Sequence, residues 1–400
     1  MNIVYLYGNS IDPTKGGIQR VTTVLADYFE SKGHSVFYIS RMIDGLVLKH
    51  VRQNYLPNSE VIICEENKGY LKSFILNNDI DVVINQNGMD PIMSELAYIV
   101  NNTKAKLFSC IHNSILSPIQ HFETTYAVQG KRYKLDKLLF LTKWKPLKST
   151  LLQFYKFKYA SHYRKLCANS EKVILLSDKF KYEISFFNKK NSSLHNVVGL
   201  PNPLSFTATI IPDLYEQKKK QIIYVGRVDR RQKKVDLLID IWEKLHLDHL
   251  DWNLKIVGGG DELPIIKKLA ADKKLENISF EGFVNPEKYY KESAVFCMTS
   301  SYEGFGIVLV EAMQYGVVPF AFDSYRSITD IIDDSQNGFL ITPFQIDKYA
   351  EKLKEIILNA DLRMKIGKAA IEKSKLFSVD EIGDKWLALI ENENFEERKS

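Results

Sequence analysis

The stretch AVFCMTSSYEGFGIVLVEAMQYG, residues 294–316, changes its periodicity once along its length. It opens with an apolar run as long as a buried strand, passes through a glycine-containing loop at 300–306, and continues with apolar residues at helical spacing as far as Gly316. A buried strand followed by a loop and a helix is the repeating unit of doubly wound α/β proteins. The stretch therefore predicts a parallel sheet, with the loop at the carboxyl end of a strand.

The same alternation extends through the chain in both directions and is interrupted once. GLPNPLSF, residues 199–206, carries two prolines and is the expected linker. We therefore expect two Rossmann-like domains, 1–200 and 207–380, facing each other across a cleft, with a helix around 380–395 packing back on the first. The expected strands are 2–8, 34–40, 81–87, 106–113 and 171–178, then 220–228, 254–260, 278–284 and 294–300; the expected helices include 18–33, 235–245 and 263–275.

Length and composition fit this division. A chain of 400 residues, 45% hydrophobic and 26% charged, is typical of globular proteins and long enough for two domains. No apolar stretch approaches the roughly 20 residues that span a bilayer, so we expect a cytoplasmic protein. The four cysteines form no CxxC pair, which favours free thiols over zinc or disulfides.

Positive charge is concentrated in one segment. Residues 131–165 contain eleven Lys or Arg and one acidic residue, Asp136, interleaved with aromatic and aliphatic side chains. This composition suits a helix lying on an anionic membrane surface, and it suits equally a helical pair with inward aromatics and solvated lysines. Nucleic acid is a third possible partner, but no DNA- or RNA-binding motif accompanies the segment, and we expect none.

The loop at 300–306 predicts an anion site flanked by carboxylates. The first N–H groups of the following helix, at Gly306, Ile307 and Val308, lack partners within the helix and lie at its positive end. Glu303 precedes them and Glu311 follows about 7 Å along the helix, at 1.5 Å per residue. Because carboxylates accept hydrogen bonds from hydroxyls, an extended ligand with a phosphate between two polyol groups fits, as in a sugar nucleotide.

These residues resemble the E-x7-E signature of retaining glycosyltransferases of family 4, the glycosyl transferases group 1, which have the GT-B fold. GRVDRRQKKVDLLI is similar to the family's Gly-Arg, lysine and apolar helix, and VGGGDE to its glycine-rich turn. In the first domain a glycine pair follows the first strand and a histidine ends the strand at 106–113. The resemblance covers nearly the whole chain.

The resemblance implies a donor-binding second domain and an acceptor-binding first domain. Two cations would stabilise the departing diphosphate, Glu303 would accept from donor-sugar hydroxyls and Glu311 from the ribose, and the leaving phosphate would help to deprotonate the acceptor. The expected catalytic residues are Glu303, Arg227, Lys233 and His112; the expected donor-binding residues are Gly16, Gly17, Lys234, Gly258, Gly259, Phe283, Val284, Phe305, Gly306, Ile307, Val308 and Glu311.

The sequence departs from the family pattern at the lysine. The family commonly has one lysine directly before a glycine, whereas RRQKKVD is one residue longer and has no glycine. Counting back from Val235 favours Lys233 over Lys234. Pro-Asn-Pro replaces the usual Asn-Gly at the linker, which makes Asn202 a weak candidate.

The resemblance implies a metal-independent hexosyltransferase that needs no cofactor and uses a nucleotide sugar, a UDP-sugar by preference. The acceptor would be a glycan or lipid-linked glycan of cell-surface polysaccharide or lipopolysaccharide biosynthesis. Asp79-Ile80-Asp81 has the form of a D-x-D metal site but precedes a buried strand of the first domain, away from any phosphate loop. The rival functions are a phosphorylase, a sugar-nucleotide epimerase and a catalytically inactive sugar-nucleotide-binding or scaffold protein; no specific signature supports the two enzymes.

Overall fold

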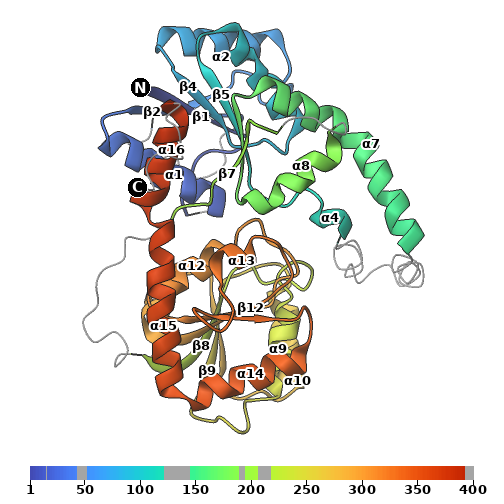
Figure 1. The fold of residues 1–400 in the computed structure, drawn as a ribbon, viewed down its shortest axis with the longest axis vertical. Coiled ribbons are helices and arrows are strands. Elements are labelled where there is room, and N and C mark those ends of the chain that lie inside the picture. The colour runs from blue at the N-terminus through green and yellow to red at the C-terminus, as the bar shows by residue number, and fades with distance from the viewer. Residues whose placement is uncertain (15, 43–51, 121–144, 189–193, 206–217, 392–400) are drawn as a thin grey trace. The chain divides into compact units, whose positions relative to one another are not determined.

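The structure is a computed structural model that describes all residues except 15, 43–51, 121–144, 189–193, 206–217 and 392–400 (Figure 1). The chain forms two compact α/β units, each built on its own parallel sheet. The described part of the second unit comprises residues 116–120, 145–150 and 218–376, and the last described helix belongs to the first unit. No described helix is both long enough and apolar enough to cross a membrane.

The first unit has a seven-stranded sheet in the order β3-β2-β1-β4-β5-β6-β7, with every pair parallel. Its central strands are buried on both faces, as expected for a sheet covered by helices on each side. The strands are β1 (Asn2–Tyr7), β2 (Ser35–Ser40), β3 (Gln53–Tyr55), β4 (Val82–Asn85), β5 (Lys106–Ile111), β6 (Lys172–Leu175) and β7 (Val197–Gly199).

Helices cover this sheet, and one of them comes from the end of the chain. α16 (Val379–Glu391) packs against α1 (Gly17–Ser31), where Trp386, Leu389 and Ile390 join the core formed by β1 and α1. The Tyr28 hydroxyl donates to the Asp384 carboxylate across this contact. The other α-helices of this unit are α2 (Glu65–Asn77), α3 (Pro91–Ala97), α8 (Lys181–Phe187) and α7 (Lys145–Asn169), of which residues 151–169 belong to the first unit. The short helix α4 (Ser117–Gln120) is grouped with the second unit.

The second unit has a six-stranded parallel sheet in the order β10-β9-β8-β11-β12-β13. The strands are β8 (Lys219–Val225), β9 (Asn253–Val257), β10 (Ile278–Gly282), β11 (Ser293–Met298), β12 (Val318–Phe322) and β13 (Phe339–Ile341). The helices are α9 (Val235–Glu243), α10 (Leu263–Asp272), α11 (Glu287–Glu292), α12 (Ile307–Met313), α13 (Ile328–Ile331), α14 (Ile346–Leu358) and α15 (Ala360–Ser374).

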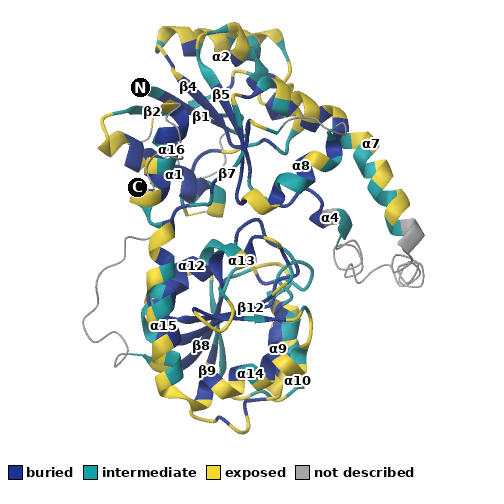
Figure 2. Cartoon of the chain, viewed as in Figure 1, coloured by how far each residue is buried: buried dark blue, intermediate teal, exposed yellow. Residues whose placement is uncertain are grey.

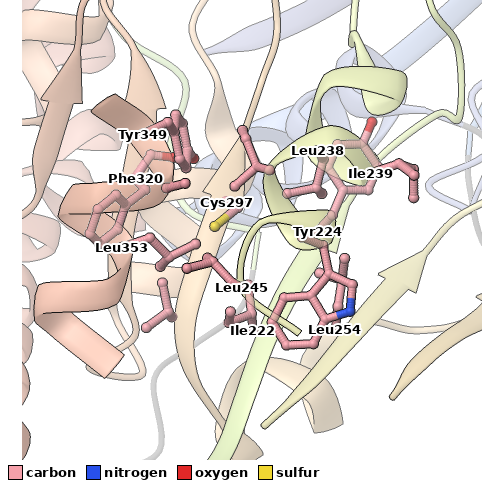
Figure 3. Packing of buried hydrophobic residues seen from close by; sticks show 14 of the residues in the cluster. Ile222, Tyr224, Leu238, Ile239, Leu245, Leu254, Cys297, Phe320, Tyr349 and Leu353 are labelled. Atoms are coloured by element: carbon pink, nitrogen blue, oxygen red, sulfur yellow. The ribbon is translucent and has the colours of Figure 1, made fainter. Parts of the chain in front are cut away.

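One large core cluster of the second unit lies between its sheet and helices that include α9 and α14. Figure 3 shows Tyr224 and Leu254 of the sheet packed beside Leu238 and Ile239 of α9, with Phe320 and Tyr349 on the far side of Cys297. Figure 2 shows buried residues along the strands and exposed ones on the outer sides of the helices. This core fixes where each strand ends, and the loops at those ends carry the candidate site.

The predicted Rossmann-like architecture is confirmed in both units, and each predicted strand overlaps an observed one. Four strands have no counterpart among the expected elements: β3, β7, β12 and β13. The expected linker begins too early, because Gly199 pairs with Leu175 as the last residue of β7. A Cβ at Gly199 would overlap the backbone at Ser177 and Asp178, so the glycine is explained by close strand packing.

Candidate functional site

The residues singled out in the second domain gather on loops at one edge of its sheet. β8 and β11 are neighbours and run parallel, so the loop after β8 and the loop after β11 leave the sheet at the same edge. The first loop ends at α9 and the second at α12. In doubly wound sheets this carboxyl edge is where ligands bind.

Glu303 and Lys233 form an ion pair across these two loops. Lys233 Nζ lies 2.5 Å from Glu303 Oε1, and the two side chains are 18% and 10% exposed. Because both side chains are largely buried, removing one partner would leave the other charge unpaired and poorly solvated. The loop after β11 thus presents its carboxylate beside a lysine 70 positions earlier in the chain.

Arg227 joins the pair through Gln232. Arg227 Nη2 donates to Gln232 Oε1 at 3.1 Å, and Gln232 Nε2 donates to the Tyr302 carbonyl at 3.1 Å and reaches Glu303 Oε2 at 3.5 Å. The Arg227 side chain is 62% exposed. It is therefore anchored at one end of its guanidinium and open to a ligand at the other.

Asp229 shapes the loop that carries these cations. Its Oδ1 accepts backbone N–H groups from Arg231, Gln232 and Lys233 at 3.1, 2.7 and 3.0 Å, and its Oδ2 accepts from Arg227 Nε at 2.8 Å. Burial alone would raise the pKa of Asp229, but the Lys233 N–H bond and Arg227 hold that pKa below its ordinary value. Burial would lower the pKa of Arg227, and Asp229 outweighs it and raises that pKa.

Lys234 lies next to the ion pair in a left-handed backbone conformation. Its φ of 52° is in the region that favours glycine, and it caps the N-terminus of α9. Its side chain is half-buried, and burial lowers its pKa. Lys233 thus carries the ion pair with Glu303, and Lys234 provides the left-handed turn into α9.

The glycine-rich turn after β9 is explained in part by packing. A Cβ at Gly258 would overlap the Gly226 carbonyl, and one at Gly260 would come 2.6 Å from the Val228 carbonyl. Gly259 has room, since its nearest neighbour would be Phe283 Cβ at 3.8 Å. Glu262 ties this turn to the loop after β8 by accepting the Arg230 N–H at 2.6 Å.

The remaining donor-site candidates differ in their exposure. Phe283 and Val284, after β10, are 75% and 45% exposed, whereas Phe305 is 3% exposed and can offer a ligand only its backbone. Gly306 has a φ of 90° and a Cβ there would come 2.6 Å from the Tyr325 hydroxyl. Ile307 and Val308 are half-buried at the start of α12.

Glu311 lies deeper than its expected role requires. It is 0% exposed and its Oε2 accepts from the Tyr290 hydroxyl at 3.0 Å. Tyr290 is itself buried and stacks on Tyr315, with 6.3 Å between ring centroids. A contact between Glu311 and a ribose hydroxyl would require this carboxylate to be uncovered when the ligand binds.

In the first unit, His112 follows β5 and Gly16 and Gly17 begin α1. His112 Nε2 contacts Gln86 Oε1 at the end of β4, and Nδ1 is buried with no hydrogen-bond partner among the described residues. Burial lowers the pKa of His112 to about 4, so the ring is neutral at pH 7. A Cβ on Gly16 or Gly17 would meet no atom within 4 Å.

Several residues that organise these sites escaped sequence analysis. Gln232, Tyr290 and Gln86 bear ordinary side chains whose roles depend on partners at least five positions away. Asp229 is different, because an Asp that heads a polar loop is a recognised signal for a turn closed by its own side chain. The described residues contain no cluster of three or more His, Cys, Asp or Glu suited to a metal ion. Asp79 and Asp81 precede β4, and Asp81 Oδ2 accepts the Asn2 N–H at 2.7 Å.

Residues 208–373 match the family model Glycosyl transferases group 1. This similarity covers most of the second unit, including both loops that form the ion pair. The chain is 32% identical over 224 residues to the amylovoran biosynthesis glycosyltransferase AmsD of Erwinia amylovora, covering 54% of this chain and 61% of that protein. It is 28% identical over 172 residues to the lipopolysaccharide 1,6-galactosyltransferase of Salmonella typhimurium, covering 41% and 47%. The matches thus span about half the length of these curated relatives.

Solved glycosyltransferase structures share the fold of the whole chain. The Anabaena HepE structure in complex with UDP and glucose aligns with a TM-score of 0.73 at 16% identity, covering 98% of this chain and 100% of that one. TarM aligns with a TM-score of 0.72 at 15% identity, covering 98% and 99%. The predicted GT-B class of two Rossmann-like domains is therefore confirmed at the level of fold.

Proposed function

We propose that this protein is a retaining glycosyltransferase of family 4 that transfers a sugar from a nucleotide-diphosphate sugar to a glycan or lipid-linked acceptor. The observation that carries the proposal is the Lys233–Glu303 ion pair, with Arg227 tied to it through Gln232, at the carboxyl edge of β8 and β11. It places two cations and one carboxylate together within a domain that matches a glycosyltransferase family.

The cations suit the diphosphate of the donor. Cleavage of the bond to the sugar leaves additional negative charge on the departing phosphate, and fixed positive charges beside it lower the barrier. Arg227 is preorganised by Asp229 and remains largely exposed, so its free N–H groups can reach phosphate oxygens. Lys233 is held by Glu303 and can serve phosphate and carboxylate together, because its ammonium has three donors.

Glu303 is the residue we assign to the donor sugar. In the ion pair its Oε1 is engaged by Lys233, and among the described residues the second oxygen has only the long 3.5 Å contact with Gln232. A carboxylate oxygen with spare acceptor capacity can bind a sugar hydroxyl. Retention then proceeds on one face of the sugar, with the leaving phosphate taking the acceptor's proton, and no protein nucleophile is required.

We assign acceptor binding to the first unit, together with ligand contacts by Gly16, Gly17 and His112. Gly16 and Gly17 are glycines without a packing reason, because a Cβ at either would meet nothing. A ligand that approaches the backbone closely explains them, through the N–H groups at the start of α1. His112 would contact the donor sugar as a neutral group, since protonation is disfavoured by burial.

The relatives point to the class of acceptor. Their names include amylovoran biosynthesis, lipopolysaccharide 1,6-galactosyltransferase and poly(ribitol-phosphate) alpha-N-acetylglucosaminyltransferase, the last two of which name a large acceptor. UDP is the preferred donor nucleotide because similar folds are described in complex with UDP. We propose cell-surface polysaccharide or lipopolysaccharide biosynthesis, with neither a metal nor a cofactor in the reaction.

Thermal-shift measurements with a panel of nucleotide sugars test donor binding first. A cognate donor at 100 times its Kd should stabilise the protein by about 2.7 kcal/mol, and UDP alone should account for part of this. Hydrolysis of that donor is then compared between wild type and Glu303→Gln. Glu355→Gln, on α14 and paired only at the surface with Lys352, is the matched control.

We expect Glu303→Gln to lower donor turnover by about 100-fold or more and Glu355→Gln to leave it unchanged. EDTA should have no effect on the wild type. Binding without any turnover by wild type would favour the inactive sugar-nucleotide-binding protein instead. Near wild-type turnover by Glu303→Gln would remove the central assignment.

A further inference from the structure

The outward face of α7 carries apolar and cationic side chains where a solvated helix would carry mixed polar ones. The helix is 25 residues long and packs on the first unit through Tyr163 and Leu166, which are 2% and 0% exposed. On the opposite side Phe154 and Phe157 are 67% and 86% exposed. Because an α-helix advances 100° per residue, these two rings lie within about 60° of each other around the axis.

Cations share this face with the two rings. At 3.6 residues per turn, Lys158, Arg164 and Lys165 fall on the same side of the helix as Phe154 and Phe157. We call these five residues the α7 face. It extends over about 16 Å at 1.5 Å per residue.

The α7 face is not neutralised by its own helix. The sequence of α7 contains no Asp or Glu, and the Lys165–Glu95 pair at 3.2 Å is 55% and 46% exposed, which makes it a weak surface pair. Among the described residues no carboxylate forms an ion pair with Lys158 or Arg164. Lys158 instead lies over the Tyr159 ring at 5.1 Å, and Arg164 Nε donates to the Ala160 carbonyl at 3.0 Å.

The exposed phenylalanines favour a lipid surface over other anionic partners. A core-packing helix gains nothing from Phe154 and Phe157 at this exposure, and leaving them in water is unfavourable. Nucleic acid binding would explain the cations, but aromatic rings on a convex helix without a groove give bases no platform. An interfacial helix needs both groups at once: rings that enter the acyl boundary and cations that meet anionic headgroups.

We propose that the α7 face binds the surface of an anionic lipid bilayer, with Phe154 and Phe157 inserted and Lys158, Arg164 and Lys165 at the headgroups. Each cation near such a surface contributes about 1 kcal/mol, which corresponds to a roughly fivefold change in binding. This proposal concerns the first unit alone and does not depend on glycosyl transfer. Residues 131–144, which extend the basic segment in the sequence, lie outside the described residues and are not needed for it.

The test is co-sedimentation of the full-length protein with vesicles, at 0.15 M salt and without any nucleotide sugar. The probe is vesicles that contain about 30 mol% phosphatidylglycerol, whose negative surface potential attracts lysine and arginine side chains. Vesicles of phosphatidylcholine alone are the uncharged comparison. Wild type should pellet with the anionic vesicles and should bind pure phosphatidylcholine at least tenfold more weakly. Donor turnover, measured separately, identifies any loss of the proposed enzyme function.

Two pairs of substitutions separate the apolar and the charged contributions. Phe154→Ser with Phe157→Ser should reduce vesicle binding at least tenfold. The binding that remains should still weaken as the salt concentration rises, because the cations are unchanged. Lys158→Glu with Arg164→Glu should abolish it at low and moderate salt. The matched controls in the second unit are Leu247→Ser with Leu250→Ser, which are 70% and 58% exposed, and Lys220→Glu with Lys268→Glu, which make surface ion pairs.

Melting curves of every variant show whether the fold is kept, and all five residues are exposed or half-exposed, so we expect unchanged melting temperatures. The proposal is overturned if wild type fails to pellet with anionic vesicles, or if the control pairs weaken binding as much as the α7 pairs. It is also overturned if the face binds duplex or single-stranded oligonucleotides in preference to vesicles, or if the phenylalanines prove to mediate self-association in sedimentation velocity.

Discussion

Lys234, beside the proposed phosphate site, has a left-handed backbone conformation that is unfavourable for any residue other than glycine. A non-glycine residue in the left-handed region is disfavoured by roughly 1 kcal/mol. Its φ of 52° lets the chain turn from the loop after β8 into α9, so that Lys233 faces Glu303. Counting back from Val235 in the sequence favours Lys233 over Lys234, and the ion pair with Glu303 supports the proposal that Lys233 is the phosphate lysine.

Lys234→Gly tests this division between the two lysines. Relief of strain should raise the free energy of unfolding by about 0.5 kcal/mol, because the flexibility of glycine in the unfolded chain offsets part of the gain. Urea denaturation measures the change, and Lys274→Gly, at a φ of 53° in the turn after α10, is the control for strain alone.

Donor KM then assigns the lysine. If Lys233 alone serves the phosphates, Lys234→Gly should keep donor KM within about twofold while Lys233→Ala loses turnover by 100-fold or more. A large rise of KM in Lys234→Gly, matched by near-normal kinetics in Lys233→Ala, would reverse the assignment.

The lowered pKa of His112 makes the free energy of unfolding depend on pH. Its pKa falls from an ordinary 6.5 to about 4 because it is buried, so the unfolded chain binds a proton between these values that the folded protein does not. Stability from this group is therefore complete above pH 6.5 and is lost as the pH falls towards 4. The loss amounts to at most about 3 kcal/mol.

Urea denaturation of wild type and His112→Gln between pH 4 and pH 7.5 measures this linkage. The free energy of unfolding should fall more steeply with acid in the wild type than in the variant. His195 is exposed, and His195→Gln serves as the control. Parallel pH dependences for wild type and His112→Gln would show that the ring is not held neutral by burial.

At the scale of elements, the carboxyl ends of the strands decide what the loops can do. The loop after β8 folds around the Asp229 carboxylate, which accepts backbone N–H groups of that loop. The loop after β11 is bonded to the loop after β8, because the Ser301 N–H donates to the Gln232 carbonyl at 2.7 Å. The turn after β9 is bonded to the same loop through Glu262, which accepts the Arg230 N–H. The candidate site is thus a set of loops bonded to one another, and the sheet supplies only their starting points.

Substitutions at two adjacent glycines after β9 distinguish a role in packing from a role in ligand binding. Gly258→Ala should lower the free energy of unfolding by about 2 kcal/mol or more, since the new Cβ would overlap the Gly226 carbonyl at a φ of 139°. Gly259→Ala should cost little, because its Cβ has room. Thermal denaturation measures both.

Donor binding by the two variants completes the comparison. We expect Gly259→Ala to keep its stability and to weaken binding of the nucleotide sugar, because a methyl group there would keep the ligand from the backbone. Unchanged donor affinity in a well-folded Gly259→Ala would show that the ligand does not approach this residue.

Sequence patterns predicted the strands that are long, apolar and followed by loops with distinctive residues. β3 and β7 are three residues each, too short to show a period, and β12 contains Pro319, which normally argues against a strand. For the site, the spacing from Glu303 to Glu311 predicted the loop and helix correctly, but not that Glu311 would be buried against Tyr290. That contact joins Tyr290 of α11 to Glu311 of α12, 21 positions along the chain, and no local pattern encodes it.

At the scale of the whole molecule, each unit has its own core, and Trp386, near the end of the chain, belongs to the core of the first unit. It is 4% exposed in the core formed by β1, α1 and α16, whereas Trp242 is 1% exposed in the core of the second unit. Truncating a large buried aromatic side chain costs about 3–5 kcal/mol. The two tryptophans therefore allow each unit to be weakened separately.

Hydrogen exchange followed by mass spectrometry can locate the two effects. Trp386→Ala should accelerate exchange in β1, α1 and β4 and spare β8–β12, and Trp242→Ala should do the reverse. The free energy of unfolding should fall by about 3 kcal/mol in each case. Uniform acceleration across both sheets by either variant would show that the two cores unfold as one.

The return of α16 to the first unit determines the order in which the chain can fold as it leaves the ribosome. Part of the surface of α1, including the Tyr28 hydroxyl, is covered by α16, whose Asp384 and Trp386 are synthesised after all of β8–β13 has emerged. Since domains generally fold as units during synthesis, the second unit can become native first, although it is encoded later than most of the first. A nascent or truncated chain that stops short of residue 379 would keep an uncovered apolar surface on α1, which is a surface that chaperones recognise and that drives aggregation.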